Sequence, residues 1–96
     1  MLDVLKIRDD FPMLKKTMHG KPLIYLDNGA TTLKPQCVID SVCDYLTNYS
    51  GNAHRGDYDL SHEVDTKFEH VRSIVADFIH CKPEEVVYTY GSSDSL

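Results

Sequence analysis

The sequence predicts an α/β fold made of two helices and two short strands. Apolar residues recur at three- and four-residue spacing along two long stretches, and this spacing is typical of helices with one buried face. Two shorter runs, residues 23–26 and 85–90, are apolar or rich in β-branched and aromatic residues, which favours strands. The chain has 96 residues, of which 42% are hydrophobic and 26% are charged, so we expect a single globular domain.

The first half of the chain predicts one strand followed by one helix. A short amphipathic opening is broken at Asp10, Phe11 and Pro12, and Gly20 begins a turn into the strand at residues 23–26. Pro35 suits the first turn of a helix. We expect this helix over about residues 35–49, with a buried face formed by Val38, Val42, Tyr45 and Tyr49.

The second half predicts a longer helix and a second strand. A polar loop at residues 50–59 leads to a capping candidate, either Asp59 or Ser61. Glu63 and Lys67 are placed as a favourable i,i+4 pair on the outer side of this helix. Pro83 stops the helix, and the strand at residues 85–90 follows. The expected buried stripe of the helix consists of Leu60, Val64, Phe68, Val71, Val75 and Phe78.

Composition and charge exclude several classes of protein. The net charge is -5 and the basic residues are scattered, which argues against nucleic-acid binding. No apolar run is long enough to span a membrane, and the opening residues do not form a secretory signal, so a cytoplasmic location is the default expectation. Cys37, Cys43 and Cys81 show no CxxC spacing, and we interpret them as reduced packing residues. The histidines lack the spacing of a metal site, so no metal is expected.

The last six residues follow the second strand and resemble the start of a helix. Glycine lets the backbone turn sharply, and the free amides of a first helical turn together with serine hydroxyls can hold a phosphate. Gly91, Ser92 and Ser93, called the glycine turn below, are therefore a candidate anion site. The alternative interpretation is a serine-rich helix cap, which these residues taken alone favour.

Three segments, in this order, carry a resemblance to a known family: YLDNGATTLKP at residues 25–35, NAHRGDYDLS at 52–61 and VVYTYGSSDSL at 86–96. Together they resemble the cysteine desulfurases of the class V aminotransferase family, in particular the branch with an AHRG-type loop that serves sulfur mobilisation. The resemblance implies the N-terminal part of a fold-type-I pyridoxal-phosphate-dependent transferase domain. It covers essentially the whole chain and corresponds to roughly the first quarter of a family member.

The resemblance also implies roles for particular residues. In relatives a Gly-Thr-Thr turn holds the phosphate of pyridoxal 5'-phosphate, and the glycine turn stands there with serines in place of both threonines. Asn28, Gly29 and Ala30 match a segment on the substrate side of the pocket, where Gly29 replaces an alanine and is expected to loosen the turn.

His54 and Arg55 match a pair near the active-site entrance and the subunit interface of relatives. A guanidinium there can anchor a carboxylate or a loop of the partner subunit. The alternative for both residues is an ordinary solvated loop. Tyr58 stands where many relatives have a second histidine, so a proton-handling role is not expected at this position.

A pyridoxal-phosphate enzyme of this kind also needs a lysine that links to the cofactor, an acid on the pyridine nitrogen and a stacked aromatic group, and a desulfurase needs a nucleophilic thiolate. The resemblance places all four downstream of the glycine turn, and no lysine or cysteine of this chain matches them. We therefore expect a truncated desulfurase segment that is inactive alone and binds no cofactor by itself. The intact family is homodimeric and converts L-cysteine to alanine and an enzyme persulfide.

Two questions stay open at the level of sequence. The chain could instead be a small interaction protein, without enzymatic activity, that docks on a full-length desulfurase. The substrate of the intact protein could be cysteine, selenocysteine or cysteine sulfinate, and its sulfur acceptor is not indicated.

Overall fold

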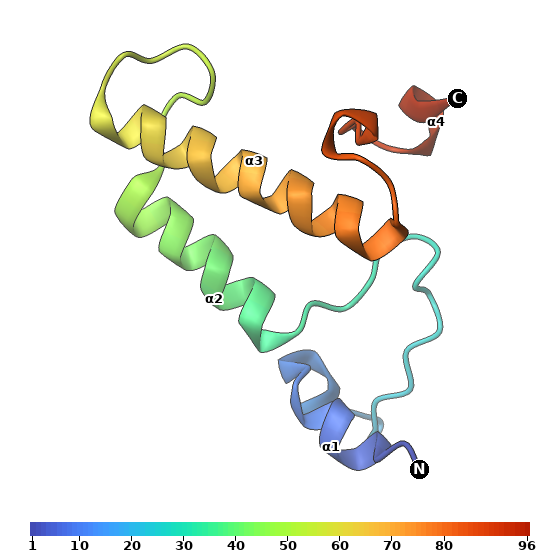
Figure 1. Ribbon diagram of the computed structural model, residues 1–96. Coiled ribbons are helices and arrows are strands. Elements are labelled where there is room, and N and C mark those ends of the chain that lie inside the picture. The colour runs from blue at the N-terminus through green and yellow to red at the C-terminus, as the bar shows by residue number, and fades with distance from the viewer. The chain divides into compact units, whose positions relative to one another are not determined.

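A computed structural model describes all residues, 1–96, as two compact units, Met1–Asn48 and Tyr49–Leu96 (Figure 1). They are called unit 1 and unit 2 below, and each is described by itself. The main helices are α2 in unit 1 and α3 in unit 2, and the only sheet is a small hairpin.

Unit 1 opens with a short helix, α1 (Val4–Asp9), and a 3-10 turn, η1 (Pro12–Lys15). The Asp3 carboxylate accepts a hydrogen bond from the Lys6 amide at 3.1 Å and so caps α1. An antiparallel hairpin follows, in which β1 (Thr17–Met18) pairs with β2 (Lys21–Pro22). Its two loop residues, His19 and Gly20, both have positive φ angles, as a type I′ hairpin turn requires.

The predicted strand at residues 23–26 is wrong, because these residues pair with no strand. Leu23 is buried and is held at its backbone: its amide donates to the Lys16 carbonyl at 3.2 Å, and its carbonyl accepts from Arg8 Nη2 at 3.1 Å. Ile24 and Leu26 are exposed. An apolar run becomes a strand only where a neighbouring strand supplies hydrogen bonds, and this unit provides none at this point.

The predicted helix at about 35–49 is confirmed in position, as α2 (Gln36–Asp44) continued by the π-helical turn η2 (Tyr45–Tyr49). Pro35 lies just before the first helical residue and has an extended conformation. The predicted burial of the apolar face is wrong for Val38 and Val42, which are exposed. The period of the sequence identifies an apolar face, but burying it needs a covering surface.

The predicted second helix is confirmed as α3 (Asp59–Ile79), the longest helix of the chain. The Glu63–Lys67 pair is also confirmed, with 2.9 Å between Oε1 and Nζ. Neither Asp59 nor Ser61 is the capping residue; Tyr58 precedes the helix, and its side chain makes no capping bond. The predicted stripe is only partly buried: Val64 is buried, whereas Phe78 is exposed.

His80 ends α3 in the left-handed conformation. The amide of Cys81 donates to the Ala76 carbonyl at 2.9 Å, and the amide of His80 donates to the Asp77 carbonyl at 3.3 Å. These two bonds satisfy the last carbonyls of α3 as in a Schellman motif. The helix therefore ends before Pro83, which begins the 3-10 turn η3 (Pro83–Glu85).

The predicted strand at residues 85–90 is wrong as well. Val86 is extended and buried, but no strand pairs with it or with the residues that follow. The segment therefore has the composition of a strand without the neighbour that would complete a ladder. After it comes a single turn of helix, α4 (Ser92–Ser95).

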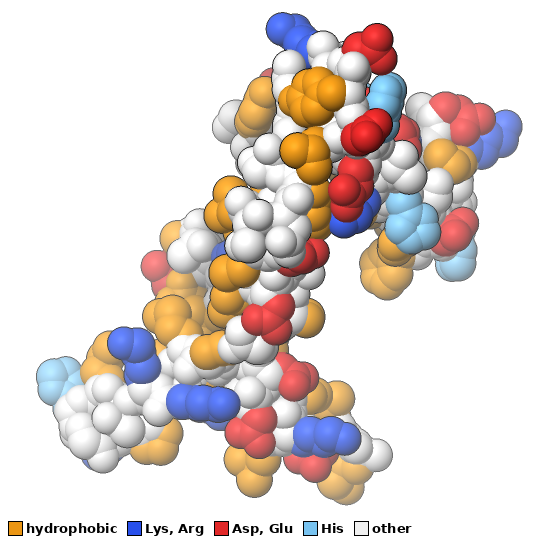
Figure 2. Space-filling view, turned by 90° about the vertical axis from the view of Figure 1, so that its left-hand side faces the viewer, with side chains coloured by type: hydrophobic (Ala, Val, Ile, Leu, Met, Phe, Trp, Pro, Cys, Tyr) orange, Lys and Arg blue, Asp and Glu red, His pale blue; other side chains and the backbone are white.

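The buried core is small and much apolar surface is exposed (Figure 2). The buried hydrophobic residues are Leu23, Val64, Ala76 and Val86. All three cysteines are free thiols, and the prediction that they pack inside is wrong for Cys37 and Cys43, which are exposed. None of the helices combines the length and the hydropathy needed to cross a membrane.

Candidate functional site

In unit 2 the loop that contains His54 and Arg55 is fastened to the first turns of α3. His54 has a φ of 62°, a left-handed conformation that is uncommon outside glycine. Its backbone amide donates to Asp65 Oδ1 at 2.7 Å, and its Nδ1 lies 3.2 Å from the same oxygen. Asp65 therefore fixes both the backbone and the imidazole of His54, in a loop that sequence alone leaves open to a solvated interpretation.

A second set of contacts packs the base of this loop. The Ser61 hydroxyl is fully buried and donates to the Asn52 carbonyl, while the Asn52 amide donates to the Tyr58 hydroxyl at 3.0 Å. A Cβ at Gly56 would lie 2.4 Å from the Tyr58 ring and 2.6 Å from Ser61 Oγ. Only glycine fits at this position, although His54 and Arg55 themselves stay exposed.

Arg55 lies in this loop, and its guanidinium has no interaction partner within the chain. Its side chain is exposed and makes no hydrogen bond, ion pair or ring contact within the chain. Neighbouring charges do not reach it, since the Asp57 carboxylate lies 3.6 Å from His62 Nε2 instead. A fixed loop with an unpaired guanidinium is suited to bind a carboxylate.

The imidazole of His54 begins a row of side chains that includes Phe68 and Arg72 of α3 and Tyr88 of the segment after η3. Its ring meets Phe68 edge-on at 5.2 Å between centroids, and Phe68 meets Tyr88 at 4.7 Å. The Arg72 guanidinium lies 4.9 Å from the centroid of the Tyr88 ring. Through this row the His54 loop, α3 and the extended segment after η3 pack against one another within unit 2.

The glycine turn begins at Gly91, three residues after Tyr88. Gly91 has a φ of 151°, a conformation that residues with a side chain rarely adopt. The amides of Asp94 and Ser95 both donate to the Gly91 carbonyl at 3.1 Å. Thr89 Oγ1 lies 2.6 Å from Ser95 Oγ, so the turn is closed onto the segment that precedes it.

The donors of the glycine turn fit a phosphate group. The hydroxyls of Ser92 and Ser93 are exposed and make no hydrogen bond within the chain. The amides of a first helical turn have no partner inside the helix and so point outward. The turn is not uniformly favourable to an anion, because the Asp94 carboxylate, which accepts from the Tyr90 amide at 3.1 Å, brings a negative charge close by.

Asn28, Gly29 and Ala30 form a turn in unit 1. The amides of Ala30 and Thr31 donate to the Asp27 carbonyl at 3.2 and 3.3 Å. The Tyr25 hydroxyl reaches the Asp27 carbonyl at 3.2 Å and the Thr31 carbonyl at 2.7 Å, which clasps the turn from one side. Gly29 has no positive φ, and a Cβ there would meet nothing within 4 Å, so the turn does not depend on glycine.

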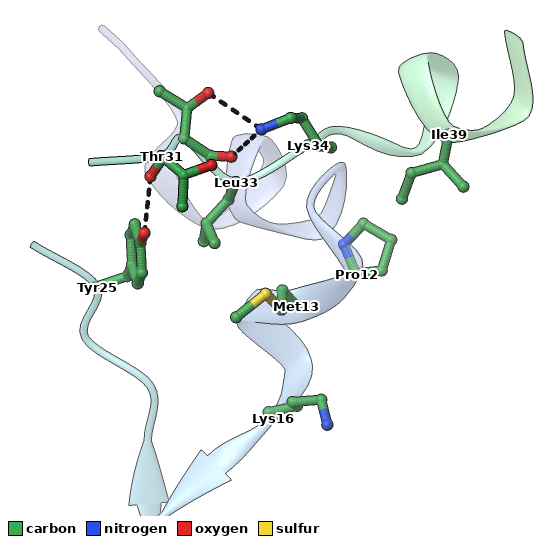
Figure 3. Close-up of a pocket in the computed structure, with 9 residues that line it drawn as sticks. Pro12, Met13, Lys16, Tyr25, Thr31, Leu33, Lys34 and Ile39 are labelled. Atoms are coloured by element: carbon green, nitrogen blue, oxygen red, sulfur yellow. Dashed lines mark hydrogen bonds between the residues drawn. The ribbon is translucent and has the colours of Figure 1, made fainter. Parts of the chain in front are cut away.

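Two pockets lie beside this turn. One, of about 470 Å³, is lined by Met13, Tyr25, Leu33 and Ile39, with Lys16 and Lys34 among its lining residues (Figure 3). The second, of about 560 Å³, includes Asn28 in its lining together with Arg8, Phe11 and Leu14. Asn28 is therefore placed where its amide can meet a bound polar group, in surroundings that are otherwise mainly apolar.

The candidate residues divide between the two units. Residues 28–30 belong to unit 1, whereas His54, Arg55 and the glycine turn belong to unit 2. Within unit 2 no hydrogen bond joins the His54 loop to the glycine turn. The row of His54, Phe68, Tyr88 and Arg72 side chains links the loop to the segment that precedes the turn. The chain contains no group of three or more His, Cys, Asp or Glu side chains that could hold a metal ion.

Sequence reasoning missed three residues that position this region: Asp65, Arg72 and Tyr88. Phe68 and Arg72 are four residues apart, a spacing that puts both on one face of a helix, so part of the signal was present in the sequence. The link from Asp65 to His54 spans a loop with a left-handed residue, and no local pattern indicates it.

Comparison with known proteins identifies relatives of the whole chain. The chain is 40% identical to a probable cysteine desulfurase of Vibrio cholerae and 42% identical to one of Streptomyces coelicolor, and each alignment covers the full chain. The chain spans only 24% and 23% of the length of these two relatives.

A solved structure shows the same relationship in three dimensions. The apo structure of a cysteine desulfurase from Thermococcus onnurineus NA1 matches with a TM-score of 0.82 and 39% identity, over 99% of this chain and 22% of that protein. The family model for class-V aminotransferases matches residues 24–96. The chain belongs to the aminotransferase class-V family, as a segment homologous to cysteine desulfurases.

Proposed function

We propose that the chain supplies the cofactor-phosphate turn and the substrate-side residues of a pyridoxal-phosphate-dependent cysteine desulfurase, and that it does not catalyse by itself. The observation that carries the proposal is the alignment of the full chain with cysteine desulfurases at about 40% identity. The reaction of the complete enzyme would transfer the sulfur of L-cysteine to an enzyme thiolate, giving a persulfide and alanine.

The residues of this chain would have binding roles in that reaction. Ser92 and Ser93 would donate their hydroxyls, and the glycine turn its amides, to the oxygens of the cofactor phosphate. Pyridoxal phosphate, when bound, supplies an electron-accepting ring. Asn28 would orient polar groups of the substrate from the pocket that it lines in unit 1.

Arg55 would bind a carboxylate or a loop of a partner subunit. The support is its unpaired guanidinium on a loop that Asp65 and Ser61 hold in place. A homodimer, as in the intact family, would bring such a loop within reach of a second subunit.

The first test mixes the purified chain with L-cysteine and pyridoxal phosphate and measures alanine. We expect release no faster than with pyridoxal phosphate alone, because no lysine or cysteine of the chain matches the catalytic residues of the family. Release that rises with protein concentration and disappears when Cys37, Cys43 or Cys81 is replaced by serine would overturn this part of the proposal.

The second test asks whether the glycine turn binds the cofactor phosphate in a complete enzyme. In a chimera, residues 1–96 replace the matching segment of a full-length relative. Alanine release and the affinity for pyridoxal phosphate are measured for this chimera and for the same chimera carrying Ser92→Ala and Ser93→Ala. We expect an active chimera and about tenfold weaker cofactor binding for each charge-assisted hydrogen bond removed. A folded chimera whose cofactor affinity does not change with the serines would contradict the assignment of the turn.

The exposed apolar surface also favours a second candidate function, a non-enzymatic interaction protein that docks on a full-length desulfurase. The two candidates differ in solution. A docking protein would form a stable complex of defined stoichiometry with a purified full-length desulfurase in analytical ultracentrifugation. A desulfurase segment would not bind an enzyme that already contains its own copy of the same segment.

A further inference from the structure

We infer that Arg72 is a positioning residue for the glycine turn. The inference rests on the proposed function, because that function makes the turn the holder of the cofactor phosphate. Arg72 lies in the middle of α3 and touches neither the turn nor the His54 loop through a hydrogen bond. Its effect on the turn would pass through the extended segment between η3 and α4.

Arg72 contacts that segment at two residues, Val86 and Tyr88. Nη1 donates to the carbonyl of Val86, and the guanidinium lies over the ring of Tyr88, 4.9 Å from its centroid. Val86 is buried, and its carbonyl belongs to a segment without a strand partner. In this chain the arginine thus satisfies a carbonyl that has no sheet ladder to join.

Arg72 is itself held in one orientation. Its Nε donates to Glu69 Oε2 at 2.9 Å, its Nη2 approaches Glu69 Oε1 at 3.4 Å, and its side chain is only 23% exposed. A guanidinium whose edges are hydrogen-bonded to Glu69 and to the Val86 carbonyl has little rotamer freedom. The contact of Phe68 with Tyr88 supports the same arrangement from the preceding turn of α3.

The glycine turn is close enough in sequence for the contacts of Arg72 with Val86 and Tyr88 to affect its position. Gly91 lies three residues after Tyr88, and Thr89 and Tyr90 are bonded to Ser95 and Asp94 of α4. The direction of the chain at Tyr88 therefore fixes where the turn begins, since the residues between are tied to the turn itself. Without Arg72, both the Val86 carbonyl and the Tyr88 ring lose the partner that holds them against α3.

Hydrogen–deuterium exchange of the chain, followed by mass spectrometry at low micromolar concentration, tests the inference. The variants are Arg72→Met, which keeps the aliphatic stem, and Arg72→Lys, which keeps a donor for the Val86 carbonyl. Arg8→Met is a matched control, because Arg8 also donates to a backbone carbonyl, that of Leu23, but in unit 1.

We expect Arg72→Met to speed exchange in residues 86–93 by about tenfold, with the exchange of α3 and the helical circular dichroism unchanged. Arg72→Lys should recover part of the protection, which a residue needed only to stabilise the helix would not do. Arg8→Met should leave residues 86–93 as in the unchanged chain.

Unchanged exchange in residues 86–93 of Arg72→Met, with α3 intact, would overturn the inference. So would a loss of protection spread equally over α3 and the turn in both Arg72 variants, because that pattern indicates general destabilisation. The proposed function fails by a different measurement, namely a chimera whose cofactor affinity is independent of Ser92 and Ser93.

Discussion

Two turns of this chain differ in whether they need glycine. A Cβ at Gly29 would meet no atom within 4 Å and the backbone has no positive φ, so the flexibility of glycine is not needed there. A Cβ at Gly56 would overlap Tyr58 and Ser61. The sequence predicted that Gly29 loosens its turn. Since the folded turn does not need glycine, the main effect of Gly29 is to raise the conformational entropy of the unfolded chain.

Gly29→Ala is therefore expected to raise the stability of unit 1 by about 0.5 kcal/mol, since alanine reduces the conformational entropy of the unfolded state. Amide exchange of residues 27–31 measures the change. Gly56→Ala is the comparison, and we expect it to destabilise the His54 loop by about 1–3 kcal/mol through overpacking. Equal effects of the two substitutions would show that the turn geometries are assigned incorrectly.

His80 offers a second test at the residue scale. It occupies the left-handed position after α3, where glycine has no steric penalty and other residues do. His80→Gly should stabilise the end of α3 by about 1 kcal/mol, measured by thermal unfolding. The control is His70→Gly in the interior of the same helix, which should destabilise by about 1 kcal/mol; a loss of stability in both variants would contradict the Schellman geometry.

At the scale of elements, the loop before α3 depends on one buried hydroxyl. Ser61 is fully buried and donates to the Asn52 carbonyl. Ser61→Ala should cost about 1 kcal/mol and increase exchange in residues 52–58, because the carbonyl loses its partner. Ser73→Ala, exposed on the same helix, is the matched control and should change neither quantity. A rigid loop in the Ser61 variant would mean that the contacts of His54 with Asp65 suffice to hold it.

The elements also show how far sequence patterns reach. Both long helices were predictable, because amphipathic periodicity is local and α2 and α3 realise it. The structure also has two short strands, as predicted, but they were placed wrongly, because residues 23–26 and 85–90 have strand composition but lack pairing partners. The hairpin of β1 and β2 was missed, although the two-residue loop of His19 and Gly20 carried a turn signal.

The candidate residues could be chosen from the sequence, but the contacts that hold them could not. The glycine turn and the His54 loop were chosen from motifs, and their roles stay predictions; the hydroxyls of Ser92 and Ser93 and the guanidinium of Arg55 are exposed. The residues that hold these motifs, Asp65 and Arg72, act across loops of irregular backbone. Such contacts depend on tertiary structure, which a single sequence does not specify position by position.

At the scale of the whole molecule, the exposed apolar surface predicts association. Ile24, Leu26, Phe78 and Val87 are each more than 75% exposed. Apolar surface and unpaired extended segments promote contacts between chains. We expect the average mass in sedimentation equilibrium to rise with concentration, and a sharp two-state melt of a monomer at high concentration would contradict this.

The central claim is that the chain holds part of a cofactor site and not a complete one. The proposed phosphate donors of the glycine turn lie at the start of a four-residue helix, with a carboxylate close by, and a single turn has too small a dipole to hold an anion alone. The exposed turn also leaves the phosphate in competition with water.

A titration of the isotope-labelled chain with pyridoxal phosphate, followed through the amide resonances of residues 91–94, tests this claim most directly. We expect no saturable shift of these resonances and no absorption change beyond that of random surface lysines. Saturable binding at micromolar cofactor that is lost in a Ser92→Ala, Ser93→Ala double variant would contradict the claim, since the turn would then hold the phosphate without any other part of the enzyme.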